Sequence, residues 1–308
     1  MAAAARNRPC DCWIIFAAQV MLQVLERGLL FVTSAVICCT GLHAQEAVTR
    51  NVEVEAEELP SAYGAPPDLS RGRISTLTKS YVLPPFSFEL ETIYEGDAFR
   101  HGAPRHWFTQ EVEMGLPLRF DVAVQNEVER FAGDTDDRIS LTGRYALADW
   151  NKIPLNPTVF AEYKFGIGHT IPDAAEFGVI LSHDFRHMVE WAMNWSVEQE
   201  VNGNQSTAWD FAQSVEVPVL LPEERLEVGL EMEYRHAEQT MRGTNQPRGF
   251  VIGPTLAWRP TKSARFDFSP LFGCSGDSPR VAIFAVFSLS LGKPSAGEAE
   301  TPASARNR

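Results

Sequence analysis

Apolar and polar residues alternate along the stretch LRFDVAVQNEVERF, residues 118–131. The even-numbered positions from Leu118 to Val128 are apolar apart from Asn126, and the odd-numbered positions up to 129 are polar or charged apart from Ala123. A period of two predicts a β-strand with two chemically different faces. In a soluble protein the apolar face would meet the core, whereas in a membrane barrel it would meet lipid and the charges would line the lumen.

The same alternation recurs in eleven further segments. Most of the twelve segments are about nine to thirteen residues long, which is the length that a tilted strand needs to cross a bilayer. An even number of strands is also typical of bacterial single-chain barrels. The twelve segments are 86–95, 107–116, 118–131, 138–147, 158–167, 175–185, 188–200, 208–219, 225–235, 249–258, 264–271 and 280–291.

The connectors between these segments are unequal in length. If the first segment runs outward, connectors at the inner end are short, as at 115–117, and those at the outer end are on average longer and more polar, as at 95–106. Outer-membrane barrels have this asymmetry. The connector 149–157 is the exception, because it is long for an inner turn.

The first residues of the chain resemble a targeting segment. Residues 28–42 form an apolar run of roughly 15 residues, shorter than the about 20 that a membrane-spanning helix needs and typical of a secretory signal. We expect cleavage after Ala44, so that residues 1–44 are a signal peptide. Met21 restarts the signal pattern and is an alternative start of translation.

Residues 45–84 lack a sustained period. They are first acidic and then rich in Pro, Ser, Gly and Ala, which indicates a periplasmic extension or linker, with an additional edge strand as the alternative. The run VEVEAEEL faintly resembles the box that TonB-dependent transporters present to TonB, but those transporters need roughly 600 residues in all, so TonB is not the partner that we favour. Residues 293–308 form a polar C-terminal tail.

We therefore predict an all-β fold, a transmembrane antiparallel up-and-down β-barrel of about twelve strands over residues 85–292. A soluble β-sandwich is the alternative, because its strands also alternate. Three features favour the membrane barrel: dense charge of both signs on the polar face, strands longer than the usual 5–6 residues, and the predicted signal peptide.

Four stretches carry a family resemblance: residues 111–130, 156–168, 211–234 and 253–273. In them a Glu-rich strand, a tight turn containing Pro and another such strand recur. They resemble bacterial outer-membrane β-barrel proteins of the porin-like, putative transporter type, some of which are linked to phenol-degradation pathways. The resemblance implies an outer-membrane location, contact with lipid, insertion by the barrel-assembly machinery, and transport of small solutes. The chain does not end on an aromatic residue, so the assembly signal is expected internally, at Phe287.

Alternation assigns individual side chains to the two faces. The residues that we predict to face lipid are Phe120, Val122, Val124, Trp191, Trp195, Leu230, Ile283 and Phe287. The residues that we predict to face the lumen are Arg119, Asp121, Glu127, Arg144, Glu162, Lys164, Glu190, Glu198, Glu227, Glu231, Glu233, Arg235, Arg265 and Asp267. Carboxylates outnumber cations in the second set, which would lower the barrier for positive solutes.

Charge and composition narrow the function. The chain of 308 residues carries a net charge of −13, which disfavours nucleic acid as a partner. We predict a narrow outer-membrane channel for small solutes with a bias toward cations; the alternative is a structural barrel whose lumen is plugged by its own charges. An outer-membrane hydrolase is the third class. Ser182, His183 and Asp184 are adjacent, but alternation points His183 away from the other two, so we predict no catalytic residue, no metal and no cofactor.

Overall fold

The computed structural model describes residues 61–167, 171–185, 188–202, 206–220, 226–237 and 249–291. These belong to one compact unit, Glu57–Arg308. The predicted signal peptide with Met21 and Ala44, the acidic residues 45–60 and the C-terminal tail lie outside the described residues. In the described part of the chain, no helix has the length and apolar character needed to cross a membrane.

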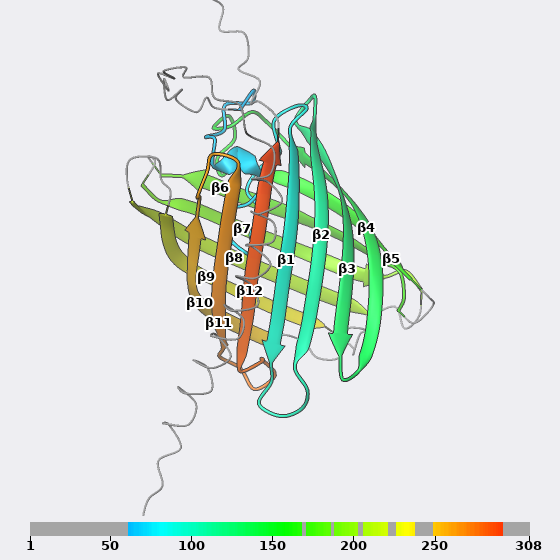
Figure 1. The fold of residues 1–308 in the computed structure, drawn as a ribbon. Helices are drawn as coiled ribbons and strands as arrows, with labels where there is room; N and C mark the ends of the chain where they lie inside the picture. The colour runs from blue at the N-terminus through cyan, green and yellow to red at the C-terminus, as the bar shows by residue number, and fades with distance from the viewer. Residues whose placement is uncertain are drawn as a thin grey trace, which may run out of the picture. The chain divides into compact units, whose positions relative to one another are not determined.

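Twelve strands form a closed antiparallel barrel (Figure 1), which confirms the predicted fold class. Each strand pairs with its neighbours in the chain, and β1 pairs with β12 to close the sheet, with Phe88 opposite Leu291. The strands are β1 Phe88–Ala98, β2 Arg105–Leu116, β3 Phe120–Phe131, β4 Asp134–Ala146, β5 Thr158–Gly166, β6 Ala174–Asp184, β7 Glu190–Glu200, β8 Thr207–Leu220, β9 Leu226–Ala237, β10 Gly249–Trp258, β11 Ala264–Gly273 and β12 Val281–Leu291.

The strand within the stretch LRFDVAVQNEVERF begins at Phe120, two residues later than the alternation suggests. Leu118 and Arg119 lie in the turn after β2, with φ angles of 66° and 62°. Two successive residues with positive φ match the right-handed twist of the flanking strands, so the hairpin can close tightly. Neither Leu nor Arg announces such a conformation, which is why the sequence pattern runs on through the turn.

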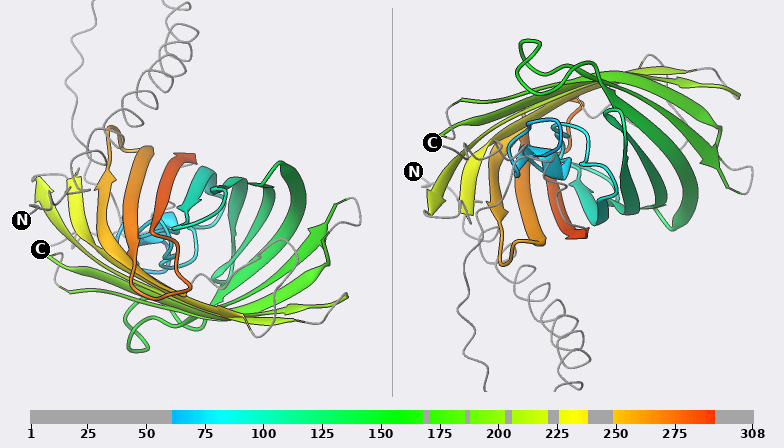
Figure 2. Two further views of the ribbon diagram at one scale, coloured as in Figure 1. Left: turned by 90° about the horizontal axis from the view of Figure 1, so that it is seen from below. Right: turned by 90° about the horizontal axis from the view of Figure 1, so that it is seen from above.

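A segment from the N-terminal side of the barrel fills part of its interior. We call residues 61–83 the inner segment. Views along the barrel show it inside the ring of strands (Figure 2). It contains the short 3₁₀ helix η2, Leu69–Arg71, which ends at Gly72 with a φ of 85°, a left-handed conformation that glycine adopts without strain. Beyond it, residues 73 and 79 pair across a tight turn.

The inner segment is anchored at one end of the barrel by apolar packing. We call this end, where β1 begins and β12 ends, the terminal end. Tyr81 is fully buried, meets the ring of Trp150 edge-on with ring centroids 5.2 Å apart, and donates a hydrogen bond of 2.6 Å to the carbonyl oxygen of Ala148. Trp150 in turn donates its backbone N–H to the carbonyl of Tyr63. The long connector after β4 therefore covers the inner segment, which gives a structural reason for its length.

Candidate functional site

The outer wall of the barrel is apolar and exposed. Val124 and Leu230, both predicted to face lipid, expose 52% and 61% of their surface, and Trp195, Ile283 and Phe287 are also exposed. Phe120, Val122 and Trp191 are half-buried. Exposed apolar side chains on so many neighbouring strands exceed what a soluble monomer shows to water.

The inner wall carries the charges. Of the residues predicted to line the lumen, the buried ones are Asp121, Arg144, Glu190, Glu198, Glu227, Glu231, Glu233, Arg265 and Asp267. Those with intermediate exposure are Glu127, Glu162, Lys164 and Arg235. Arg119 differs from the rest, because it lies in the turn before β3. Its guanidinium binds Asp149, in the connector after β4, at 2.9 Å and lies 5.9 Å from the centre of the Tyr145 ring. Arg119 thus lies at the rim of the barrel.

Two cations of the inner segment bind carboxylates of the wall. Lys79 Nζ lies 3.0 Å from Glu91 Oε2, 3.0 Å from Glu111 Oε1 and 3.4 Å from Glu113 Oε2. The Arg73 guanidinium donates to both oxygens of Glu91, through Nη2 at 2.8 Å and Nε at 3.0 Å. A planar guanidinium that binds both carboxylate oxygens gives a strong and directional contact. These bonds attach the inner segment to β1 and β2.

A wall cation completes this network. Arg144 on β4 donates to Asp121 Oδ1 at 2.9 Å and forms an ion pair with Glu113. Asp121 also accepts the backbone N–H of Leu83 at 3.1 Å, where the chain leaves the lumen to begin β1. The carboxylates of β1–β3 are therefore shared between cations of the inner segment and one cation of the wall.

Hydroxyl groups attach the other side of the inner segment. Thr78 Oγ1 lies 2.6 Å from Ser214 Oγ on β8. Glu231 on β9 accepts hydrogen bonds from the hydroxyl of Thr76 at 2.5 Å and from the backbone N–H of Leu77 at 2.7 Å. The inner segment thus spans the lumen from β1 to β9.

Near the terminal end lies a second group of charges. Arg259, just after β10, forms ion pairs with Asp68 of the inner segment and with Glu227 Oε1, the latter at 3.1 Å. Arg265 donates to Asp267 at 2.8 Å and to the backbone carbonyls of residues 73 and 74. The inner segment is therefore held at its start, at its turn and at its exit.

The opposite half of the lumen holds a third network. Lys164 Nζ lies 2.6 Å from both Glu176 Oε2 and Glu198 Oε2, and Arg235 lies 3.7 Å from Glu198. Two cavities border this network, of about 80 and 40 Å³. Since one water molecule in the liquid takes up about 30 Å³, these described cavities admit a few water molecules and no large solute.

The wall itself has a defect between β10 and β11. Pairing is continuous from Val251 to Ile252 and from Leu256 to Trp258, but the three pairs between them are missing. The register places Pro254 opposite Pro270 there, and neither residue has an N–H to donate. On the lumen side a side-chain bond of 2.8 Å from Ser269 to Thr255 spans the interruption.

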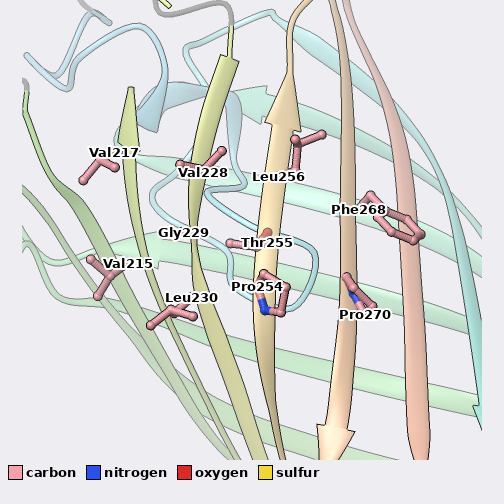
Figure 3. Close-up of a pocket in the computed structure, with 10 residues that line it drawn as sticks. All are labelled: Val215, Val217, Val228, Gly229, Leu230, Pro254, Thr255, Leu256, Phe268 and Pro270. Carbon is pink, nitrogen blue, oxygen red and sulfur yellow. The ribbon is translucent and has the colours of Figure 1, made fainter. Parts of the chain in front are cut away.

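An apolar pocket of about 550 Å³ lies on the outer surface at this interruption (Figure 3). Thr255 borders the pocket, while its hydroxyl lies 3.0 Å from Ser75 of the inner segment. The wall between the outer pocket and the inner segment is therefore one residue thick. The pocket is lined by Val215, Val217, Val228, Gly229, Leu230, Pro254, Thr255, Leu256, Phe268 and Pro270.

No sequence pattern marked the residues of the inner segment that bind the wall. Arg73, Lys79 and the hydroxyl-rich run STLTKS lie in a stretch without periodicity, so no strand or helix signal marked them. The surplus of inward-facing carboxylates was the one signal that further cations would lie inside the barrel, because buried charges need partners. Among the three adjacent residues considered for catalysis, the Ser182 hydroxyl donates to the Ser80 carbonyl at 2.7 Å, and the His183 ring packs on Phe185.

No protein-family model matches the chain, and no curated protein matches it. Solved structures do. The NanC porin is 8% identical at a TM-score of 0.45, over 67% of this chain and 99% of that chain. The KdgM porin is 8% identical at a TM-score of 0.45, over 66% of this chain and 99% of that chain. An outer-membrane channel from Pseudomonas putida F1 is 9% identical at a TM-score of 0.47, over 68% of this chain and 97% of that chain. Similarities this distant do not indicate a function, and the barrel is established by the strand pairing of this chain itself.

Proposed function

We propose that the protein is an outer-membrane channel for small solutes, that the inner segment closes it, and that its open form prefers cations. The observation that carries the proposal is a closed barrel with an apolar outside, a charged inside and a separate chain segment bound across the lumen. The predicted signal peptide supports export, and the exposed apolar wall supports contact with lipid. We assign no reaction to the barrel.

The contacts of the inner segment support reversible closure. Its apolar contacts are the anchor around Tyr81 and the packing of Leu77 against Val251 and its neighbours. Its polar contacts with the wall are ion pairs and hydrogen bonds, such as those of Lys79 and Thr78. A hydrogen bond exchanged for one to water changes stability by only about 0.5–1.5 kcal/mol. Water that enters the lumen can therefore replace the hydroxyl bonds at modest cost each, whereas the buried ion pairs favour the closed form. None of these contacts is a strand-pairing bond of the barrel, so the inner segment can leave its site without unfolding the strands.

Opening would increase the negative charge of the lumen. When the inner segment leaves, Arg73 and Lys79 leave with it, whereas the wall charges stay. In the part of β1–β4 nearer the terminal end, Arg144 is then the cation that remains beside the buried carboxylates. A ring of carboxylates attracts cations and repels anions. The carboxylates in this region are Glu89, Glu91, Glu111, Glu113 and Asp121.

Planar-bilayer recordings test the proposal. We expect the purified full chain to show brief openings, and a variant that lacks residues 61–83 to conduct continuously, with a reversal potential in a KCl gradient that marks cation preference. Replacing Glu91, Glu111 and Glu113 by Gln in that variant should reduce the preference, whereas Glu176→Gln, in the opposite half of the lumen, should leave it nearly unchanged. Heat-modifiable migration on a gel checks that each variant is folded.

Two results would contradict the proposal. If the folded variant without residues 61–83 remains silent, the barrel is a structural one. If it conducts but prefers anions, the carboxylates of β1–β3 do not control selectivity.

The wall defect favours a second candidate function, the lateral passage of small apolar solutes. A solute in the lumen would leave through the interruption at Pro254 and Pro270 into the apolar pocket and then into lipid. Replacing both prolines by Val restores two N–H donors to the ladder and should slow the uptake of an apolar dye into proteoliposomes without changing ion conductance. Pro218→Val, on β8, is the control. Unchanged uptake in the double variant would exclude this route.

A further inference from the structure

Glu190, the first residue of β7, is a buried acid with one carboxylate oxygen that lacks a hydrogen-bond partner in the described part of the chain. It exposes 8% of its surface, and its Oε2 atom has no hydrogen-bond partner among the described residues. A carboxylate taken out of water without compensation costs several kcal/mol. Such a group must take up a proton or bind a cation.

Two further carboxylates converge on Glu190. One oxygen each of Asp68, Glu190 and Glu227 lie within 4.8 Å of one another. Three parts of the chain supply them: the inner segment, the start of β7 and the start of β9. The second oxygen of Glu227, Oε2, is also buried without a hydrogen-bond partner. Arg259 forms ion pairs with Asp68 and Glu227 and attracts Glu190 electrostatically.

The charge of this group is not balanced. Three carboxylates and the one guanidinium of Arg259 sum to −2. The neighbouring Arg265 also attracts Glu190 and Glu227, but its ion pairs are with Asp267 at 2.7 Å and Glu216 at 3.6 Å. A divalent cation would offset the remaining negative charge and supply a partner for Glu190 Oε2.

We propose that Asp68, Glu190 and Glu227 bind one Ca²⁺ ion, which links the inner segment to β7 and β9. Calcium prefers oxygen ligands at about 2.3–2.6 Å, in flexible geometry and with water completing the shell. Two oxygens on opposite sides of a calcium ion are therefore about 4.6–5.2 Å apart, a spacing that a group within 4.8 Å can adopt with little movement. Magnesium, at about 2.0–2.1 Å, would require the three side chains to draw closer.

A cavity lies near the site at the terminal end. It has a volume of about 670 Å³ and is lined by Gly64 and Pro66 of the inner segment and by Val189, next to Glu190. The site itself does not depend on the proposed function. Its consequence for gating rests on that function, because a cation that holds Asp68 to the wall would hold the channel closed.

Calorimetric titration of the folded, detergent-solubilised full chain with CaCl₂, after treatment with chelator, tests the site. We expect one Ca²⁺ per chain and a loss of affinity of at least about tenfold in Glu190→Gln and in Asp68→Asn, since removing even an outer-shell partner of a metal costs about 10–100-fold. Glu176→Gln is the matched control, because Glu176 forms an ion pair with Lys164 in the opposite half of the lumen. This variant should leave the calcium affinity unchanged.

Absence of calcium binding in the unmodified chain, or unchanged affinity in Glu190→Gln, would overturn the proposal. Trypsin cleavage after Arg71 supplies a second readout: chelator should accelerate it in the unmodified chain and have no effect in Glu190→Gln. Equal acceleration in both would overturn the link to the inner segment. A barrel that stays silent without residues 61–83 would refute the channel and leave the calcium titration unaffected.

Discussion

Lys79→Met removes the cation that three wall carboxylates share. Lys79 Nζ lies 3.0–3.4 Å from one oxygen each of Glu91, Glu111 and Glu113, and its side chain is 16% exposed while theirs are 1–2% exposed. Methionine has a similar length but no charge. The variant therefore keeps much of the packing and deletes the ion pairs.

The variant affects the three carboxylates unequally, because they differ in the partners that remain. Glu91 keeps Arg73 at 2.8 Å, and Glu113 keeps its ion pair with Arg144. Glu111 keeps the hydrogen bond from the amide of Gln125, at 2.9 Å, but no ion pair to another cation among the described residues. Breaking a buried ion pair costs about 3–5 kcal/mol, and the surviving partners place this variant at the lower end of that range. A loss of about 3 kcal/mol weakens binding of the inner segment roughly a hundredfold.

Two assays measure this effect. In planar bilayers the fraction of time that the channel is open should rise, and trypsin should cleave after Arg71 and Arg73 more rapidly. Lys152→Met is the control, since this lysine lies exposed in the connector after β4 and should behave as the unmodified chain. If Lys79→Met folds yet changes neither opening nor cleavage, the ion pairs of Lys79 do not hold the inner segment and the reasoning fails.

Three further predictions concern the wall. Val124→Arg should destabilise the folded barrel by about 2–4 kcal/mol if the residue lies near the bilayer midplane. Gln125→Ala, on the opposite face, should cost little stability. Equal losses of unfolding free energy, measured by reversible unfolding from liposomes, would contradict the assignment of faces. Arg144→Met should cost about 3–5 kcal/mol, because it leaves buried carboxylates without their cation, and an unchanged urea midpoint would count against the network. Gly115→Val should loosen the exit of the inner segment, since a Cβ there would overlap the carbonyl oxygen of Pro84; trypsin sensitivity equal to that of the unmodified chain would refute this.

The sequence predicts the strands well because a wall that is one residue thick exposes a strict period of two. The charged residues from Glu227 to Glu233 alternate with apolar ones throughout β9, and the structure buries the charged set. Boundaries are less certain, as at Leu118 and Arg119, where a turn preserves the alternation by chance. The contact of the apolar face with lipid stays a prediction.

The interior could not be predicted in the same way. The partners of Lys79 are 12 to 34 residues away in the chain, and Thr76 meets Glu231 across 155 residues. No local pattern specifies such contacts, since a segment bound inside a barrel needs neither helical nor strand periodicity. The interruption at Pro254 and Pro270 is similar: each proline is visible in the sequence, but only the register places one opposite the other.

A reversible cross-link tests the closed channel most directly. Thr78 Oγ1 and Ser214 Oγ lie 2.6 Å apart, one on the inner segment and one on β8. In a Cys274→Ser background, the double variant Thr78→Cys, Ser214→Cys should form a disulfide that abolishes channel openings under oxidising conditions, and a reductant should restore them. Thr78→Cys alone should show neither effect. Openings that persist unchanged in the oxidised double variant would contradict the claim that the inner segment closes the barrel.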